Sequence, residues 1–250
     1  FVKKVIIKNR VRIIYHLSAI INSSILNENQ FSDVKTTIIS TLNLLKIVKL
    51  YPDKKIIFGS SVAVYGASKG KLFKENSICK PIFSYSLCKK TAEDYILYFA
   101  NYFSLNFVIV RIGNVYGPYQ PKIGEVGVIN IFIKNLLKKK TLKIFGDGKQ
   151  KRDFIFIDDA VSFLQKSEKL SGIFNLATGI STSVNSLIKI LKNKSKHSLK
   201  IKKEKKRKEE IGISKYDVKK AKKTGWRPKY KINNGIYKTL EFYERNRKFL

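Results

Sequence analysis

The sequence predicts an α/β protein with a doubly wound parallel sheet. In the first half of the chain, short runs rich in β-branched and aromatic residues alternate with longer stretches of helical periodicity. Strands that alternate with helices of this length are typical of parallel sheets with right-handed crossovers. The chain has 250 residues, of which 44% are hydrophobic, so it can bury a sizeable core without disulfides or metals.

The elements of the first half follow in order. Residues 12–18 (RIIYHLS) read as a buried strand, and apolar residues at helical spacing predict a helix over 33–50, with Ser32 as its cap. The run KIIFGS predicts a second strand over 55–60. A second helix over 84–103 and a third strand over 106–112 complete this half.

The second half is less regular. Turn residues predict a loop at Gly117-Pro118 and Pro121 and a turn at 146–148. The expected elements are a helix over 128–139, a strand over 154–157, a helix from Asp158, a strand over 172–177, a helix capped by Ser183, and a final helix after Trp226-Arg227-Pro228. The lysine-rich stretch 192–208 is expected to be a solvated surface strand or loop.

The charge balance is strongly basic, with a formal net charge of +33 from 51 Lys+Arg and 18 Asp+Glu. Only 8 of the basic residues are Arg, and the charge is spread over the chain. Arg is the better reader of phosphates and bases, so we interpret the excess as compositional drift and expect no specific nucleic-acid partner. No apolar run is long enough to span a membrane, and two Cys cannot form a disulfide framework. The default location is therefore a reducing cytoplasm.

Three residues form a candidate proton-transfer set. Tyr85 and Lys89 are four residues apart on a predicted helix and so lie on the same face. A lysine ammonium that close lowers the pKa of a phenol, but a Tyr-x-x-x-Lys pair alone is also common on helix surfaces. Its position strengthens the case, because Ser61, 24 residues earlier, ends a predicted parallel strand. Ligands bind beyond the carboxyl ends of such strands.

Six segments in register resemble the extended short-chain dehydrogenase/reductase family, in its NAD-dependent nucleotide-sugar epimerase/dehydratase branch. They are YHLSA at 15–19, IIFGSSVAVYG at 56–66, YSLCK at 85–89, VRIGNVYGP at 110–118, GDGKQKRDFIFIDDA at 146–160 and FNLATG at 174–179. Their order and spacing cover nearly the whole chain. The resemblance implies a Rossmann-type fold, NAD as cofactor, a nucleotide-sugar substrate and, for a complete protein, a homodimer.

The resemblance also implies roles by position. Tyr85 matches the catalytic acid/base, Lys89 the residue that holds the cofactor ribose, and Ser61 the catalytic Ser/Thr. Further cofactor-binding positions are Leu17, Ser18, Ser60 and Ile112, and the substrate-binding positions are Asn114, Arg152 and Arg207, with Glu210 as an acidic companion of Arg207. No metal site is implied. Residues 1–115 match an incomplete NAD-binding domain to which 150–180 return, and 116–149 with 181–250 match a sugar-nucleotide domain.

The sequence departs from the family pattern at its start. The family opens with a G-x-x-G-x-x-G turn that binds the NAD pyrophosphate, and no such motif occurs here. Thr37 stands where many relatives have Asn, and Ser18 where Ala is usual. Residue 1 is Phe and there is no Met, so we interpret the sequence as a fragment. We expect residues 1–250 alone to fold poorly, to bind NAD weakly and to lack activity.

The residues after Ser61 bear on the type of reaction. Relatives that dehydrate or decarboxylate carry acidic residues there, whereas this chain has Val62 and Ala63. Neither can transfer a proton, which favours 4-epimerisation of a UDP-hexose through a transient 4-keto intermediate. The alternatives are a 4-keto-sugar reductase or a 4,6-dehydratase and, from another class, an inactive remnant or a basic binding protein.

Four other features are expected to be structural. His16 is interpreted as a structural residue at a strand end rather than a ligand, and His197 as a solvent-exposed side chain among lysines. Asp158 and Asp159 are expected to cap a helix rather than to bind a metal. Cys79 and Cys88 are expected to be free thiols.

Overall fold

The computed structural model describes residues 1–19, 30–67, 70–120, 127–195, 198–206 and 213–250. The contacts divide the chain into two compact units. The first unit contains residues 1–66, 75–112 and 162–176, and the second contains 67–74, 113–161 and 177–250. The domain boundaries expected from the sequence stay a prediction.

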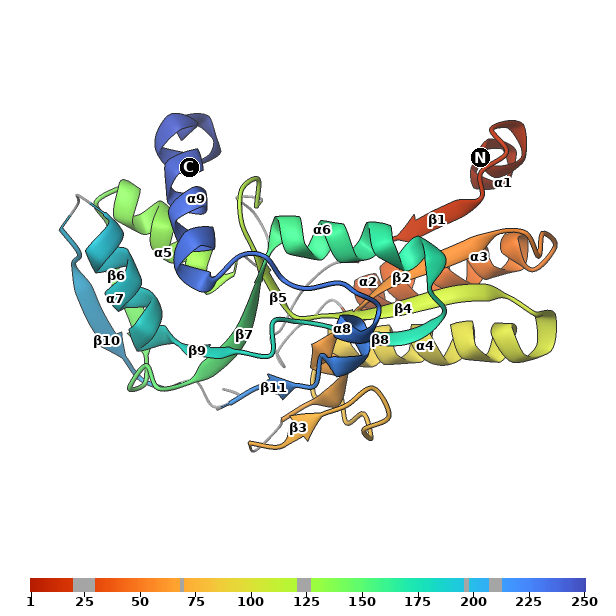
Figure 1. Cartoon of the computed structure of the whole chain (residues 1–250), viewed down its shortest axis with the longest axis horizontal. Coiled ribbons are helices and arrows are strands. Elements are labelled where there is room, and N and C mark those ends of the chain that lie inside the picture. Colours follow the sequence, from red (N-terminus) through yellow and green to blue (C-terminus); the bar gives the residue numbers. More distant parts are fainter. Residues whose placement is uncertain (20–29, 68–69, 121–126, 196–197, 207–212) are drawn as a thin grey trace. The chain divides into compact units, whose positions relative to one another are not determined.

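The first unit contains a four-stranded, fully parallel sheet (Figure 1). Its strands in spatial order are β1 (Ile13–His16), β2 (Lys55–Ser61), β4 (Asn106–Ile112) and β8 (Gly172–Leu176). The run Val108–Val110 of β4 is completely buried, as expected for a central strand covered on both faces. The predicted doubly wound α/β architecture is confirmed.

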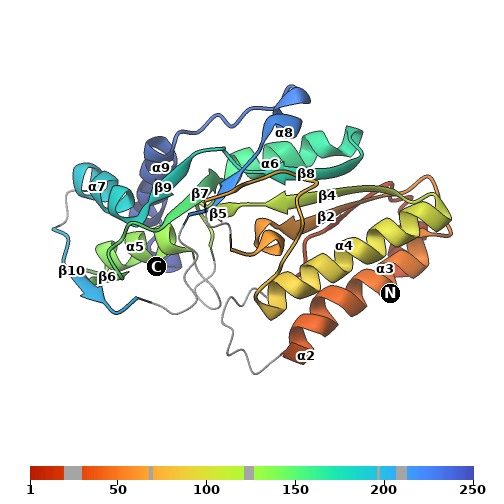
Figure 2. The ribbon, with the colours of Figure 1, turned by 90° about the horizontal axis from the view of Figure 1, so that it is seen from below.

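Two long helical segments cover one face of this sheet (Figure 2). One consists of α2 (Gln30–Asp33), a π-helical turn η1 (Val34–Ile39) and α3 (Ser40–Val48); the other is α4 (Ser84–Phe103). Leu45, Ile96 and Phe58 are fully buried in the core between helices and strands. Ser32 lies inside α2 and is not the cap expected for the first of these segments, because α2 already includes Gln30.

Shorter segments complete the first unit. Helix α1 (Val2–Lys8) precedes β1, and the 3₁₀ turn η2 (Val62–Tyr65) follows β2 directly. On the face of the sheet away from α4, Phe163 near the end of α6 (Ile157–Lys166) packs edge-on against Phe174 of β8, and η3 (Ser167–Lys169) follows α6.

The second unit is built from short strands and helices. β5 (Asn114–Tyr116) pairs in parallel with β7 (Lys151–Phe156), which pairs antiparallel with β9 (Ser181–Ser183). Two parallel pairs join β6 (Leu142–Phe145) to β10 (Ile201–Glu204) and β3 (Leu72–Phe73) to β11 (Lys215–Tyr216). The helices are α5 (Val128–Leu137), α7 (Val184–Lys194), α8 (Lys219–Lys223), α9 (Ile232–Arg245) and the 3₁₀ turn η4 (Arg247–Phe249). Ile133, Leu187 and Ile236 are buried in their common core.

Several expectations for this half are refined by the structure. Ser183 is the N-cap of α7, and its hydroxyl accepts a hydrogen bond from the backbone N–H of Ser186, as predicted. The strand expected over 154–157 begins earlier, at Lys151, and Ile157 already belongs to α6. The lysine-rich stretch begins in α7, which extends to Lys194, and contains β10. Among the described helices, none has the length and apolar character to cross a bilayer.

Candidate active site

Ser61 is the last residue of β2, at the carboxyl end of the parallel sheet. Its side chain is half-buried, and its hydroxyl accepts a hydrogen bond of 3.2 Å from the backbone N–H of Ala63. This bond caps η2 and fixes where the Ser61 side chain points. The predicted position of Ser61 at a strand end is therefore what the structure shows.

Tyr85 and Lys89 lie one turn apart near the start of α4, the helix that packs on β2 and η2. Lys89 is 1% exposed, and its ammonium donates a hydrogen bond of 2.6 Å to the backbone oxygen of Gly59. Its Nζ also lies 4.6 Å from the centre of the Phe58 ring. Lys89 thus anchors α4 to β2 two residues before Ser61, and Tyr85 is half-buried one turn earlier. Burial lowers the pKa of Lys89 to about 8.

His16, the last residue of β1, forms a hydrogen-bonded chain with three neighbours. Its Nε2 lies 2.8 Å from the Thr41 hydroxyl, and its Nδ1 lies 3.3 Å from the Ser18 hydroxyl. The proton of the Thr41 hydroxyl is donated to the Thr37 carbonyl at 2.6 Å, so His16 Nε2 must donate to Thr41 and Ser18 must donate to Nδ1. Burial, followed by the charge of Lys89, lowers the pKa of His16 to about 4. His16 is therefore a neutral structural residue at a strand end, as expected.

The remaining cofactor positions expected in this unit also lie at strand ends. Leu17 and Ser18 directly follow β1 and are exposed. Ser60 precedes Ser61 and is buried, and its hydroxyl donates a hydrogen bond of 2.5 Å to Glu93 of α4. Ile112 is the last residue of β4, which pairs with β2. The structure therefore brings Ser60, Ser61, Ile112, Lys89 and the β1 end to one edge of the sheet, where α/β proteins bind ligands.

The expected substrate-binding residues lie in the second unit. Asn114 begins β5, and its side-chain amide donates a hydrogen bond of 3.0 Å to the backbone oxygen of Asp153 on β7. Arg152 is half-buried on β7, and its guanidinium donates to the Lys151 carbonyl at 3.1 Å. Asn114 and Arg152 thus lie on two paired strands, with Asn114 opposite Phe154 and Arg152 two residues before it. Arg207, with Glu210, lies outside the described residues, as does His197.

Asp153 is a residue of this site that the sequence analysis did not identify. It is fully buried, and its carboxylate accepts hydrogen bonds from the Thr178 N–H (2.9 Å), the Thr178 hydroxyl (2.6 Å) and the Gly179 N–H (2.7 Å). Burial raises its pKa, and these hydrogen bonds act in the opposite direction. The signal that could have revealed it is an acidic residue directly before the apolar run at 154–157, because an acid that is buried with such a run needs hydrogen-bond partners.

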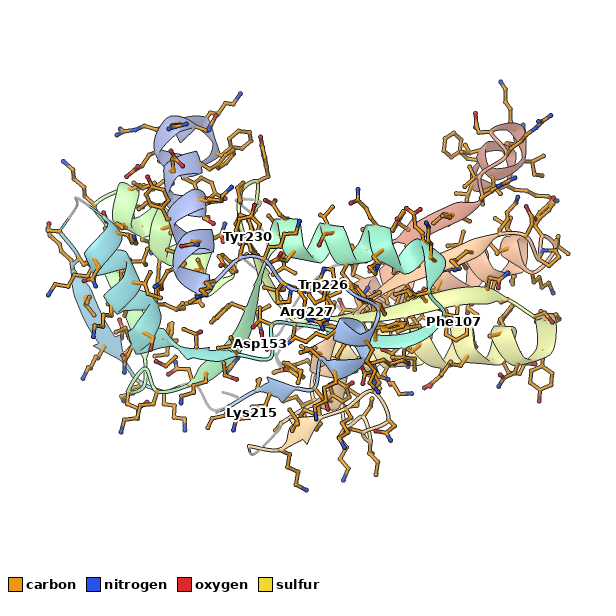
Figure 3. The ribbon with its side chains drawn as sticks, in the orientation of Figure 1. Phe107, Asp153, Lys215, Trp226, Arg227 and Tyr230 are labelled. Carbon is orange, nitrogen blue, oxygen red and sulfur yellow. The ribbon has the colours of Figure 1, made fainter. Side chains whose placement is uncertain are left out.

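Asp158 and Asp159 lie in the first turn of α6 but behave differently. Asp158 is exposed, whereas Asp159 is buried and accepts hydrogen bonds from the backbone N–H groups of Lys229 (2.8 Å) and Tyr230 (3.0 Å). Asp159 therefore holds the segment that contains Trp226 and Tyr230, between α8 and α9 (Figure 3). Helix α6 already begins at Ile157, so neither aspartate has the cap position expected from the sequence. Cys79 and Cys88 are free thiols, as expected. The described residues contain no group of three potential metal ligands.

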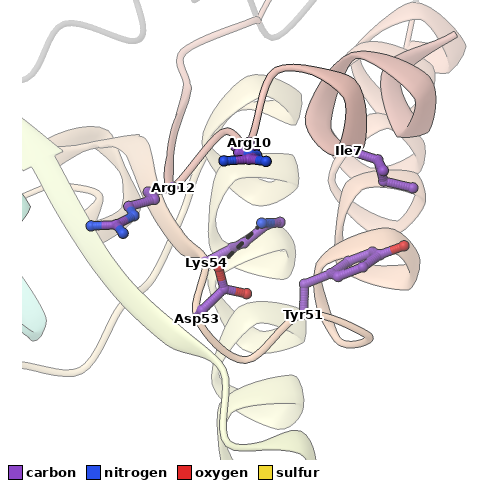
Figure 4. Close-up of a pocket in the computed structure, with 6 residues that line it drawn as sticks. All are labelled: Ile7, Arg10, Arg12, Tyr51, Asp53 and Lys54. Atoms are coloured by element: carbon purple, nitrogen blue, oxygen red, sulfur yellow. Dashed lines mark hydrogen bonds and ion pairs between the residues drawn. The ribbon is translucent and has the colours of Figure 1, made fainter.

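A shallow basic cavity of about 290 Å³ lies at the amino ends of the parallel strands, opposite to the Ser61 end (Figure 4). It is lined by Arg10, Arg12 and Lys54, with Ile7, Tyr51 and Asp53. Arg12 and Lys54 directly precede β1 and β2, so the cavity is at the amino ends of these strands and separate from Ser61.

The parallel sheet, with Ser61, Tyr85 and Lys89 at its carboxyl edge, defines a Rossmann-fold enzyme of the short-chain dehydrogenase/reductase type. A model of the NAD dependent epimerase/dehydratase family matches residues 1–177, and the chain belongs to this family. It is 35% identical over 238 residues to a putative UDP-glucose 4-epimerase of Methanocaldococcus jannaschii, covering 94% of this chain and 78% of that protein.

Solved structures agree with this assignment. The crystal structure of UDP-glucose 4-epimerase from Thermotoga maritima with UDP-glucose superposes with a TM-score of 0.90 at 32% identity, covering 98% of this chain and 81% of that chain. UDP-glucose 4-epimerase from Thermus thermophilus in complex with NAD also gives a TM-score of 0.90, at 25% identity, covering 97% of this chain and 81% of that chain.

The residues at the carboxyl edge of the sheet fit the nicotinamide–ribose half of NAD. Lys89 has three N–H donors, and one of them is used by the Gly59 carbonyl, which leaves donors suited to ribose hydroxyls. The Thr37 hydroxyl oxygen is buried and has no hydrogen-bond partner among the described residues. A bound ligand would provide such a partner. The donor set therefore fits this half of the cofactor, while the sequence has no Gly-rich turn for the pyrophosphate.

Proposed function

We propose that the chain catalyses the NAD-dependent 4-epimerisation of a UDP-hexose. The observation that carries the proposal is the carboxyl end of β2, where Ser61 lies beside the helix that carries Tyr85 and Lys89. The similarity to two UDP-glucose 4-epimerases of known structure over nearly the whole chain supports the choice of reaction. A reducing cytoplasm stays our expectation for its location.

The chemistry that NAD supplies when bound is reversible acceptance of a hydride from carbon 4 of the sugar. Tyr85 takes the proton of the 4-hydroxyl and later returns it. Lys89, with a pKa of about 8, is still mostly charged at neutral pH, so its ammonium stabilises the tyrosinate. The Ser61 hydroxyl hydrogen-bonds the same sugar oxygen. Arg152 holds the diphosphate, for which its planar donor fork is suited, and Asn114 contacts the sugar nucleotide.

The residues that follow Ser61 favour epimerisation over dehydration. Val62 is buried, and Ala63 donates its backbone N–H to the Ser61 hydroxyl. Neither side chain can donate or accept a proton. A 4,6-dehydratase needs a proton-transfer group in addition to Tyr85. A reductase of a 4-keto sugar stays the second candidate, because it needs no more groups than an epimerase.

The test compares two tyrosines of the same helix. Tyr85→Phe should lower turnover of UDP-galactose to UDP-glucose by about 10²–10⁴-fold while leaving nucleotide-sugar binding intact. Tyr95→Phe, at an exposed position of α4, should stay within about twofold of the unchanged protein, since it touches no reacting group. Because the sequence lacks a Gly-rich turn, both variants are assayed in residues 1–250 and in the same residues joined to the Gly-rich segment of a relative. Turnover of Tyr85→Phe near that of Tyr95→Phe removes Tyr85 from this role.

The products distinguish the remaining candidates. An epimerase interconverts the two hexoses with no net change in NAD redox state. Accumulation of a 4-keto-6-deoxy sugar points instead to a dehydratase, and stoichiometric oxidation of a reduced nicotinamide points to a reductase. No turnover in either protein favours a catalytically inactive remnant.

We also infer that two copies of the chain pair through α4. Four exposed side chains share one stripe along this helix, at helical spacing: Leu87, Tyr95, Tyr98 and Tyr102, the last of them 71% exposed. Light scattering should show a dimer for the chain and a monomer for Tyr98→Lys. Tyr237→Lys, an exposed tyrosine of α9, is the matched control and should stay dimeric. A dimer that survives Tyr98→Lys contradicts this arrangement.

A further inference from the structure

A buried network of polar side chains lies directly behind the Ser61 end of the sheet. Its centre is Glu93 of α4, which is fully buried and forms an ion pair with Arg111 of β4. The two Glu93 oxygens accept from Arg111 Nε at 3.0 and 3.3 Å and from Nη2 at 2.7 Å. Such a fork-to-fork geometry fixes the orientation of both groups.

The network ties together the carboxyl ends of three strands. Ser60 of β2 donates to Glu93, and Arg111 Nη1 donates at 2.9 Å both to the Tyr65 hydroxyl and to the Glu75 carbonyl. Tyr65, at the end of η2, donates at 2.6 Å to Asn175 of β8. Every link is well within hydrogen-bond range, so the network is a rigid support.

Glu93 is also one turn beyond Lys89 on the same helix. The groups that act electrostatically on Lys89 are Glu93 and, from the end of β1, His16, with Tyr85 one turn earlier on α4. His16 is neutral at pH 7, because its pKa is about 4. Glu93 is thus the negative charge that opposes the effect of burial on the Lys89 ammonium.

We propose that Glu93 is a positioning residue of the active site: it lies one turn from Lys89, is paired with Arg111, and through its bond to Ser60 fixes the strand end that carries Ser61. The inference rests on the proposed function for its catalytic consequence. Two effects do not depend on the substrate. The charge of Glu93 acts on the Lys89 ammonium, and the bond from Ser60 to Glu93 holds the end of β2.

The first experiment measures Lys89 directly. In the full chain labelled with ¹³C at the lysine ε-carbon, Lys89 should titrate near pH 8, separately from exposed lysines, which titrate near ~10.4. A Lys89→Arg variant assigns its signal. Glu93→Gln keeps the shape and hydrogen-bonding capacity of the side chain but removes the charge, so the Lys89 midpoint should fall by about one pH unit or more.

The matched control is the neighbouring acid on the same helix. Asp94 is exposed and pairs with Lys90, so Asp94→Asn removes the same charge on the solvent side. The Lys89 midpoint should stay unchanged in Asp94→Asn. An unchanged midpoint in Glu93→Gln, or an equal shift in both variants, overturns the proposal.

A second variant tests whether Glu93 holds the end of β2 in place. It can also be measured if Glu93→Gln does not fold. Ser60→Ala removes one hydrogen bond to Glu93 and leaves both charges in place. It should lower kcat by about 10-fold or more with little change in KM, since a displaced catalytic group affects the chemical step. Ser167→Ala, which removes a buried hydroxyl bonded to the Leu164 carbonyl, is the control and should leave kcat unchanged.

The outcomes separate this inference from the proposed function. If the unaltered protein turns over no UDP-hexose but Lys89 shifts as expected, the proposed function fails and the role of Glu93 in Lys89 ionisation stands. If epimerisation occurs and Ser60→Ala has the kcat of Ser167→Ala, the support of the Ser61 strand end by Glu93 is wrong.

Discussion

Gly66 faces the backbone carbonyl of Lys80 so closely that no side chain fits between them. A β-carbon built on Gly66 would lie 2.0 Å from the Lys80 oxygen. Gly66 also has φ 75° and ψ −148°, a conformation that is essentially restricted to glycine. This contact closes the η2 turn, whose first residues follow Ser61.

Substitution of Gly66 should therefore be far more costly than substitution of a comparable glycine. Gly66→Ala combines backbone strain with a backbone clash and should lower the free energy of unfolding by about 3 kcal/mol or more. Gly70 also has a positive φ, of 88°, but a β-carbon there meets nothing within 4 Å, so Gly70→Ala should cost about 1–2 kcal/mol. Urea unfolding of both variants measures the difference, and equal losses would contradict the clash.

The two adjacent aspartates of α6 make a second matched pair. Asp159→Ala removes the buried carboxylate that accepts from the backbone N–H groups of Lys229 and Tyr230, and it should cost about 2–4 kcal/mol. Asp158→Ala, at the exposed neighbour, should change stability by about 0.5 kcal/mol or less. Thermal unfolding distinguishes these outcomes, and similar melting temperatures for the two variants would show that Asp159 does not hold this segment.

His16 should make stability depend on pH below neutrality. Its pKa is about 4 in the folded chain and about 6.5 when unfolded, so between these values the unfolded state binds a proton that the folded state does not. Stability is therefore lost as the pH falls from about 6.5 to 4, by about 3 kcal/mol from this residue. In His16→Gln this part of the pH dependence should disappear. An unchanged slope between pH 6.5 and 4 would refute the assignment.

The basic composition should produce only weak, non-specific binding to nucleic acid. Lysines dominate the excess of positive charge, and lysine acts on phosphate as a point charge without reading sequence. Affinity for two unrelated DNA duplexes should be similar and should fall steeply between 50 and 200 mM salt, by about 10³-fold or more if several phosphates are contacted. Selective binding of one duplex at physiological salt is the result that would count against this view.

The sequence predicted the regular part of the first unit closely. The helix 84–103 and the strand 106–112 have the predicted bounds. A strong helical period predicts only a helix, and a continuous run rich in β-branched residues predicts only a strand. The short strands β3, β5, β9 and β11 were not predicted. Each has two or three residues, and its pairing partner lies on another segment of the chain, so no local pattern marks it.

The same distinction applies to the site. Ser61, Tyr85 and Lys89 were identified because their chemistry follows from residue type and local spacing. Glu93 and Asp153 were missed, because their importance depends on burial and on partners brought close by the fold, such as Arg111 for Glu93 and Thr178 for Asp153. An acidic residue beside an apolar run can suggest burial, but the sequence does not show which partner the fold will bring to it.

The π-helical turn at Val34–Ile39 allows this segment to lose one residue without losing its helical form. Each π turn holds one residue more than an α turn, so deleting a single residue here would restore a regular α-helix. Because the π turn absorbs the extra residue, residues 30–33 would keep their orientation relative to 40–48, and Asp33 would stay buried beside α4. A one-residue deletion should therefore be tolerated within Val34–Ile39, whereas the same deletion inside the regular helix α3 would rotate its two flanks by about 100° relative to each other.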